Sequence, residues 1–171
     1  MMEKETQDRF IDSWGSMGQL WGINISVARV HALLLLSDSP VSLDEIAKTL
    51  GISRGNASMS LKELKNWGII RLVKEPGDRQ DYYVTEPDVW KIFFLIMRGR
   101  KRREFDPLLD AVNETIASMP KSSGPVNTRI RQLHDLLQTL DWVGEAALAN
   151  EDRARTTMTM LSKLLGVKKK K

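Results

Sequence analysis

The sequence predicts a mainly α-helical chain with one small β-hairpin, and three features indicate this fold class. Apolar residues recur at helical spacing on both sides of residues 69–84. Within residues 69–84, two short runs of β-branched and aromatic residues flank a turn-rich segment. Capping residues, glycines and prolines stand where the helical patterns begin and end. The expected order is therefore helices, a hairpin, and more helices.

The first expected helix runs from about Glu3 to Trp21, and Gly22 can end it. Its apolar residues lie on one face at spacings of four, three and four: Phe10, Trp14, Met17 and Trp21. Ser26 can cap a second helix. The inward stripe of that helix is expected to be Val27, Val30, Leu33 and Leu34.

Two further helices follow around a glycine corner. Ser42 and Glu45 have the form of a capping box, in which the Ser42 hydroxyl accepts the Glu45 amide proton and the carboxylate reaches back. This short helix ends at Gly51-Ile52, where glycine supplies a left-handed turn and the isoleucine is buried in the corner. Ser53 can cap a third helix that runs to about Trp67.

Residues 69–73 and 82–84 are the expected strands of the hairpin, and the polar loop 75–80 joins them. From Thr85 onward the pattern is helical. Thr85 is expected to cap this helix, with Pro87 in its first turn. The expected inward residues are Val89, Ile92, Phe93 and Ile96.

The C-terminal part is expected to hold several helices. Asp106-Pro107 should kink or break the helix that begins near Thr85. A linker at 119–125 precedes a helix with a heptad-like seam, and residues 150–152 can cap a last helix. The seam positions are Ile130, Leu133, Leu137, Leu140, Gly144 and Ala147.

Composition excludes several classes of site. The chain has no cysteine and two histidines, His31 and His134, so we expect neither a metal site nor a cofactor. It shows no Ser-His-Asp arrangement, P-loop or dinucleotide fingerprint, so we do not expect an enzyme. The polar N-terminus lacks a signal peptide, and the apolar stretches 32–36 and 92–97 are too short to cross a bilayer. We expect a cytoplasmic protein with no membrane association.

The net charge gives only weak evidence for nucleic-acid binding. The formal charge is +4, but without the tail Lys168–Lys171 the Lys and Arg residues would only equal the 22 Asp and Glu. We interpret this tail as a solvated end, with non-specific attraction to phosphates as the alternative. An argument for DNA binding must therefore rest on a local pattern.

That local pattern is the order of elements from residue 27 to residue 84, which is the order of a winged helix-turn-helix. In such a unit the third helix lies in the major groove of double-stranded DNA. Asn56 can pair with adenine, Met59 can pack on a thymine methyl, and Arg79 at the hairpin tip can reach a phosphate or the minor groove. The candidate DNA-binding residues are Ser53, Arg54, Gly55, Asn56, Ser58, Met59, Lys62, Lys65 and Arg79.

These candidate residues also allow interpretations without DNA binding. The cations of the third helix can form an ordinary solvated surface, and Met59 can simply pack. A winged helix can also serve as a protein–protein or assembly module without binding DNA, although the outer face would then be apolar rather than rich in Asn, Ser and Lys. Salt-dependent binding to duplex DNA distinguishes these functions.

The apolar stripes outside the winged unit indicate a homodimer. A unit of about 60 residues cannot bury the apolar stripes of the first helix and of the helices after Thr85. We therefore expect two chains to bury these stripes against each other in a shared helical interface. A monomeric core is the alternative. The expected division is a dimerisation helix (1–25), a DNA-binding domain (26–86), a helical dimerisation region (87–167) and a basic tail (168–171).

Two further features admit alternatives. Three tryptophans, Trp14, Trp21 and Trp90, could line an aromatic cage for a cationic small-molecule effector, although aromatic residues at helical spacing more often form core or interface. The basic run Arg98–Arg103 could touch the DNA backbone, but we favour a solvated or ion-paired role.

The sequence also resembles a known family over roughly residues 5 to 110. The residues that carry the resemblance are Trp14-Gly15, Ala28-Arg29, Leu43–Ala47, Leu50–Asn56, Gly77-Asp78-Arg79 and Arg98–Glu104. They resemble the MarR-like winged-helix regulators of the GbsR group. The resemblance implies a dimeric repressor on a pseudo-palindromic operator, with the interface formed by helices outside the winged unit. Members of the group are linked to osmoprotectant and quaternary-ammonium metabolism.

Overall fold

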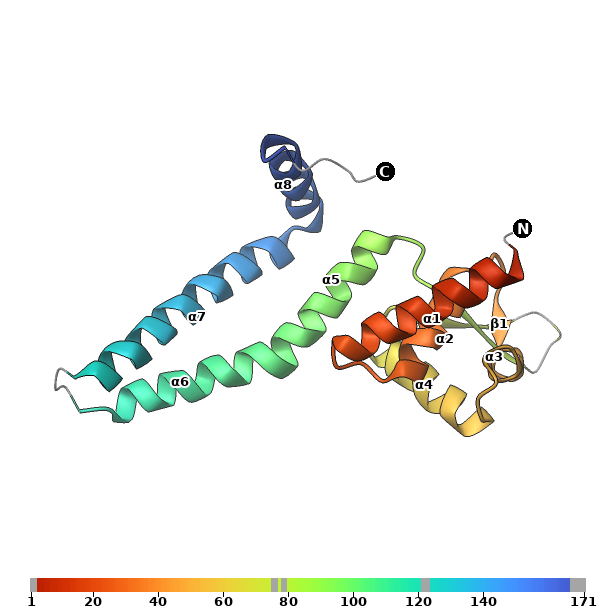
Figure 1. The fold of residues 1–171 in the computed structure, drawn as a ribbon, viewed down its shortest axis with the longest axis horizontal. Helices are drawn as coiled ribbons and strands as arrows, with labels where there is room; N and C mark the ends of the chain where they lie inside the picture. Colours follow the sequence, from red (N-terminus) through yellow and green to blue (C-terminus); the bar gives the residue numbers. More distant parts are fainter. Residues whose placement is uncertain (1–2, 75–76, 78–79, 121–123, 167–171) are drawn as a thin grey trace. The chain divides into compact units, whose positions relative to one another are not determined.

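The computed structural model describes residues 3–74, 77, 80–120 and 124–166 (Figure 1). The chain divides into two compact units, Met1–Leu95 and Ile96–Lys171. The predicted fold class, mainly helical with a small antiparallel sheet, is confirmed. Among the described residues, no helix is both long enough and apolar enough to cross a membrane.

In the first unit, α1 (Lys4–Leu20) packs on α2 (Ile25–Leu35) through a face of small residues. Gly15 and Gly18 are buried there, and a Cβ added to Gly18 would lie 2.6 Å from the Cβ of Ala28. The apolar stripe of α1 is therefore not its main packing face. Trp21, at its end, remains 54% exposed.

The predicted start of α2 is wrong by two residues. Asn24 caps this helix, and its Oδ1 accepts a hydrogen bond from the Ser26 backbone N–H at 2.8 Å. Asn and Ser are both good N-caps, so the sequence alone did not separate them. Val27, Val30 and Leu34 are buried as expected, whereas the remaining member of the predicted stripe, Leu33, is half-buried.

The left-handed glycine corner is confirmed, whereas Ile52, expected to be buried there, is half-buried. Ser42 and Glu45 form the predicted capping box at the start of α3 (Leu43–Leu50): the Ser42 hydroxyl accepts from the Glu45 N–H at 3.3 Å, and the Ser42 N–H donates to Glu45 Oε2 at 2.9 Å. The Ser42 N–H and the Ser42 hydroxyl both donate to Glu45 Oε2, the hydroxyl at 2.7 Å, and these two hydrogen bonds lower the pKa of Glu45. Gly51 has φ of 63°, the left-handed conformation that sends the chain into α4 (Arg54–Asn66).

The hairpin strands belong to a sheet of three strands rather than two. β2 (Ile70–Lys74) and β3 (Asp81–Thr85) pair as predicted, but β1 (Val41–Ser42) adds to the other side of β3, which gives the order β1-β3-β2. A strand of two residues after Pro40 has no alternation to detect. It forms only because tertiary packing brings it against β3.

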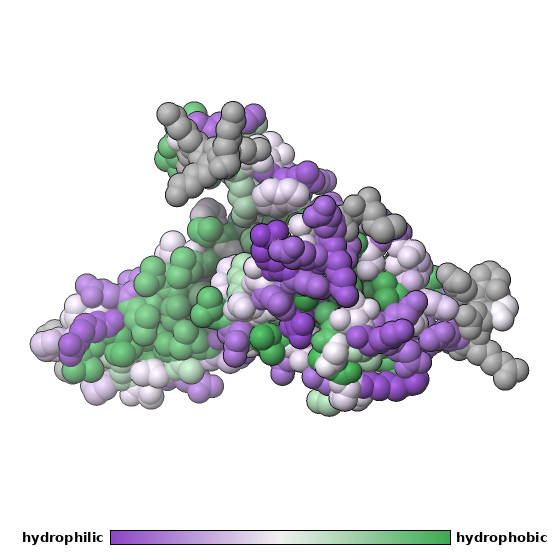
Figure 2. All heavy atoms as spheres, turned by 45° about the vertical axis from the view of Figure 1, so that its right-hand side comes forward, coloured by the Kyte–Doolittle hydropathy of each residue, from purple (hydrophilic) through white to green (hydrophobic). Residues whose placement is uncertain are grey.

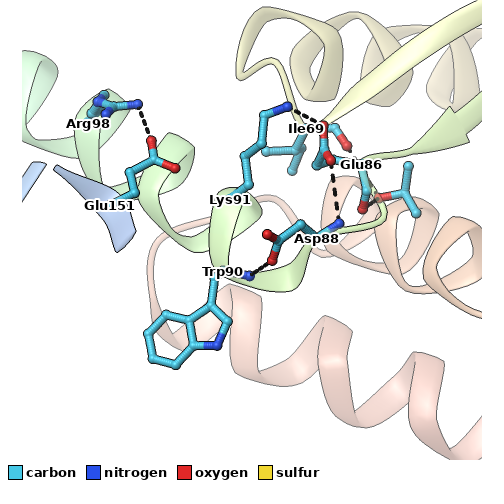
Figure 3. Close-up of polar contacts among 8 residues, drawn as sticks. Ile69, Glu86, Asp88, Trp90, Lys91, Arg98 and Glu151 are labelled. Carbon is cyan, nitrogen blue, oxygen red and sulfur yellow. Dashed lines mark hydrogen bonds and ion pairs between the residues drawn. The ribbon is translucent and has the colours of Figure 1, made fainter. Parts of the chain in front are cut away.

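The predicted cap of the next helix is also wrong. Thr85 ends β3, and α5 (Val89–Arg100) begins after Pro87. Asp88 Oδ1 accepts from the Trp90 N–H at 2.9 Å and so serves as the cap, while the Thr85 hydroxyl donates to the Ile69 carbonyl at 3.3 Å (Figure 3). Thr85 therefore belongs to the sheet, although the local sequence pattern predicts it as the helix cap.

The inward face of α5 also differs from the prediction. Ile92 and Phe94 are buried, whereas Val89 is 64% and Phe93 39% exposed. Ile92 and Phe94 lie on nearly opposite sides of the helix at about 100° per residue. The helix is therefore buried from two sides, which an argument from a single apolar stripe cannot predict.

The second unit consists of the end of α5 and the helical segments that follow it: η1 (Lys101–Phe105), α6 (Asp106–Ser118), α7 (Pro125–Ala149) and α8 (Glu151–Leu164). The expected interruption at Asp106-Pro107 takes the form of a change of helix type and not of a loop. Pro107 lies in the first turn of α6, directly after the π-helical turn η1. A π turn changes the hydrogen-bond register locally, so the helical path continues through the proline.

The basic run at the end of α5 is ion-paired, as favoured. Arg98 pairs with Glu151 at 2.7 Å (Figure 3), and Arg100 pairs with Glu104 at 3.0 Å. The Lys101 ammonium contacts three carboxylates at 2.7–2.8 Å, those of Asp106, Asp141 and Glu145. Hydrogen bonds to these carboxylates raise the pKa of Lys101 above its usual range. These cations stabilise the second unit.

Candidate nucleic-acid interface

The helix α4 is held in the first unit by one apolar face. Ala57, Leu61 and Leu64 are at most 1% exposed, and the Ser60 side chain is buried with them. This face packs on α2 and α3. The Ser53 hydroxyl caps the helix by accepting from the Asn56 N–H at 3.1 Å. Buried packing and the cap together fix the direction in which the opposite face points.

That opposite face is open to solvent. Gly55, Ser58, Lys62 and Lys65 are exposed, and Met59 is 74% exposed. Within the part of the chain that the structure describes, neither lysine forms an ion pair. The centre of the face is therefore a polar surface with free ammonium groups, small residues near its N-terminal end and one exposed methionine.

Two candidate residues at the edges of this face are held by other helices. Arg54 Nη1 lies 2.8 Å from Oδ1 of Asp44 in α3, in a pair whose side chains are 70% and 54% exposed. On the other edge, Asn56 Nδ2 donates to the Ser26 hydroxyl of α2 at 3.0 Å, and both residues are half-buried. The outer face thus lies between an arginine anchored to α3 and an asparagine anchored to α2.

Sequence reasoning missed Ser26 and Asp44 as members of this site. Ser26 had been assigned to the cap of α2, a role that Asn24 fills. The sequence analysis assigns no contact to Asp44, which lies between the capping residues Ser42 and Glu45. Their roles depend on contacts between helices that are far apart in sequence, and periodicity carries no signal for such contacts.

The wing is described only in part. Lys74 and Asp81 close the ladder of β2 and β3 with an ion pair of 2.5 Å, and Gly77 in the loop has φ of 85°. Arg79, the candidate at the hairpin tip, lies outside the described residues. Its assignment as a DNA contact stays a prediction.

The outer face of α4 has the geometry of a nucleic-acid surface. Among the described residues, no group of three or more His, Asp or Glu side chains could hold a metal ion. The exposed face of α4 offers cations for phosphates and an amide and hydroxyl for base edges. The helix is capped, rigidly packed on one side and open on the other, which is the arrangement that a groove helix needs.

Comparison with known proteins supports this interpretation. The MarR family model matches residues 23–81. The HTH-type transcriptional repressor GbsR of Bacillus subtilis (strain 168) is 25% identical over 154 residues, which cover 84% of this chain and 85% of that protein. The HTH-type transcriptional repressor OpcR of the same organism is 22% identical over 154 residues, covering 82% and 81%.

A solved structure described as a transcriptional regulator shares the fold, with a TM-score of 0.66 and 21% identity. It covers 86% of this chain, and 99% of its own length is matched. The matched family segment, residues 23–81, contains α2, β1, α3, α4 and β2, and it ends at the first residue of β3. Residues 23–81 thus match the MarR family, and most of the chain is similar to HTH-type transcriptional repressors, in agreement with its resemblance to the GbsR group.

Proposed function

We propose that this chain is a transcriptional repressor that binds a pseudo-palindromic operator as a homodimer. The observation that carries the proposal is the outer face of α4, which is exposed, cationic and positioned by a buried apolar face on α2 and α3. Two relatives, GbsR and OpcR, are named as repressors. An assembly module would not need free lysines and a half-buried amide on this face.

The helix α7 supports the homodimer. At about 100° per residue, its apolar residues cover roughly half of the circumference. The part centred on Leu137, which is 6% exposed, packs within the unit. The adjacent part stays 39–61% exposed along most of the helix: Val126, Leu133, Leu136, Leu140 and Val143.

Figure 2 shows apolar side chains gathered over the hairpin of α6 and α7. Single exposed apolar residues are ordinary on a monomer, but a stripe this long indicates a covered surface. A second copy of the chain fits the stripe because a two-fold axis pairs a self-complementary face with itself. Of the six predicted seam positions, Leu133, Leu137 and Leu140 lie in or beside this stripe.

A two-fold symmetric dimer also determines the symmetry and the half-site spacing of the operator. Two copies of α4 related by such an axis would enter successive major grooves roughly 34 Å apart. The operator is then expected to contain two related half-sites about one helical turn apart. The wing would add its contact through Arg79 beside each half-site.

The test is binding of the full chain to duplex DNA fragments from the source genome, followed by fluorescence anisotropy across a salt series. We expect log affinity to fall linearly with log salt, because Lys62 and Lys65 displace counterions from phosphates. Lys62→Ala should reduce the slope by about 1, whereas Lys163→Ala on the exposed end of α8 should leave it unchanged. A slope near zero for the unmodified chain would contradict DNA binding and favour the assembly module.

The wing is tested in the same assay. Arg79→Ala is expected to weaken operator binding by about 1–3 kcal/mol. Unchanged affinity, with a circular dichroism spectrum like that of the parent, would remove the wing from the mechanism.

A cationic effector stays a prediction. Trp14 stacks on Phe10 with ring centroids 5.6 Å apart, and Trp90 stacks on Phe94 at 6.3 Å. Each ring therefore already has an aromatic neighbour, as core packing requires. Loss of DNA affinity on adding a quaternary ammonium ion, and not on adding the same concentration of sodium, would support the effector.

A further inference from the structure

A series of hydrogen bonds connects the start of α2 with the start of α4. Asn24 Oδ1 accepts from the Ser26 N–H at 2.8 Å, and the Ser26 hydroxyl accepts from Asn56 Nδ2 at 3.0 Å. The Asn56 N–H then donates to the Ser53 hydroxyl at 3.1 Å. The link from Ser26 to Asn56 spans thirty positions of sequence and connects two helices.

This link controls the orientation of one amide group. An asparagine amide has one oxygen that accepts and two N–H groups that donate. Ser26 engages one N–H of Asn56, and within the described residues no partner engages the amide oxygen or the second N–H. Those two groups are the ones that pair with N6 and N7 of adenine in the major groove. In the structure the Nδ2 end of the amide faces the Ser26 hydroxyl of α2.

The location of Asn56 suits such a role. The residue lies on the edge of the outer face of α4, one position after the exposed Gly55, and it is half-buried against α2. A side chain that is already ordered loses less rotamer freedom when it binds a partner. A serine that holds Asn56 in place therefore favours the one base that matches the fixed amide.

We propose that Ser26 is a specificity-determining positioning residue, which orients the Asn56 amide to select adenine at one position of each operator half-site. The proposal rests on the proposed function, because it assumes that α4 enters the major groove. Ser26 itself touches no base. It acts through the hydrogen bond from Asn56.

The test is selection of bound duplexes from a library with a randomised central region, with each variant of the full chain, followed by sequencing. Asn56→Ala is expected to abolish the adenine preference at one position per half-site. Ser26→Ala should reduce that preference about 3- to 10-fold, the effect of one hydrogen bond, and leave the salt dependence of affinity unchanged. Ser26→Thr keeps a hydroxyl and should retain most of the preference.

The matched control is Ser16→Ala on α1, which removes an exposed hydroxyl bonded to the Asp12 carbonyl at 2.9 Å and should leave every base preference unchanged. Thermal unfolding of each variant separates loss of fold from loss of specificity. If Ser26→Ala retains the parental preferences while Asn56→Ala loses one, positioning by Ser26 is refuted and the repressor proposal stands. If Asn56→Ala also leaves the preferences unchanged, Asn56 reads no base and the inference fails. If the parental chain selects no sequence, both proposals fail.

Discussion

Acidification is expected to destabilise the first unit through a single buried histidine. His31 lies in α2, is 3% exposed, and packs its ring beside that of Trp14 with centroids 6.1 Å apart. Its Nε2 lies 3.5 Å from the Thr85 hydroxyl, at the end of β3. Burial lowers the pKa of His31 from 6.5 to about 4, because the charged imidazolium cannot be solvated there.

The sign and size of the effect follow from proton linkage. In the unfolded chain the His31 ring gains a proton near pH 6.5, whereas in the folded chain it does so only near pH 4. Between these values the unfolded state binds more protons. The contribution of the neutral ring to stability is therefore complete above pH 6.5, falls as pH decreases through this window, and is lost below about pH 4. The full difference corresponds to about 3 kcal/mol.

The assay is urea unfolding followed by circular dichroism at pH values from 7 to 5. The free energy of unfolding of the parental chain should fall by about 2 kcal/mol over this range because of His31. His31→Gln cannot titrate and should lose that dependence. The window lies above the range in which carboxyl groups usually titrate, so the lowered pKa values of Glu45 and Glu86 act mainly at lower pH.

His134→Gln on α7 makes the same chemical change and should retain the dependence contributed by His31. Parallel pH profiles for the parental chain and His31→Gln would refute the reasoning. So would an NMR titration in which the His31 ring gains its proton near pH 6.5.

Two further predictions concern packing. Leu136→Glu in the exposed stripe of α7 should convert dimers to monomers in sedimentation velocity, because a charge would be desolvated in the interface. Gln138→Glu, on another side of the helix, should leave the dimers intact, and intact Leu136→Glu dimers would place the interface elsewhere. Gly18→Ala should lower the free energy of unfolding by about 1–3 kcal/mol, because the new Cβ would lie 2.6 Å from the Ala28 Cβ. Gly99 lies in α5 with open space beside it, so Gly99→Ala should instead raise the free energy of unfolding by up to about 1 kcal/mol. Equal melting curves for Gly18→Ala and Gly99→Ala would contradict the packing of α1 on α2.

The elements that sequence predicted well are those specified by local chemistry. The capping box of α3, the left-handed Gly51 and the Ser53 cap of α4 each depend on residues within four positions of one another. The buried stripe of α4 follows from helical period alone. Local rules therefore sufficed for the helix-turn-helix, which is the part of the fold that presents the candidate site.

The errors arose where distant segments decide the outcome. The strand β1 exists because β3 lies beside it, and Thr85 belongs to that sheet rather than to a helix cap. The face of α1 that contains Gly15 and Gly18 carries no large apolar side chains, so hydrophobic periodicity does not reveal it, although α2 packs closely against it. The link between Ser26 and Asn56 is of the same kind. Each depends on tertiary contacts that no window of the sequence contains.

The two anchored edges of α4 differ in what they allow on binding DNA. The pair of Arg54 and Asp44 is largely exposed, and such pairs contribute only about 0–1 kcal/mol. Arg54 can therefore exchange Asp44 for a phosphate at little cost and adapt to the path of the backbone. Asn56 is half-buried and fixed from α2, so it can only accept a base that fits its orientation. In the proposed complex, an adaptable phosphate contact and a base-selecting contact then lie on opposite edges of one helix. Substitutions at Asp44 should therefore change affinity for all sequences alike, whereas substitutions at Ser26 should not.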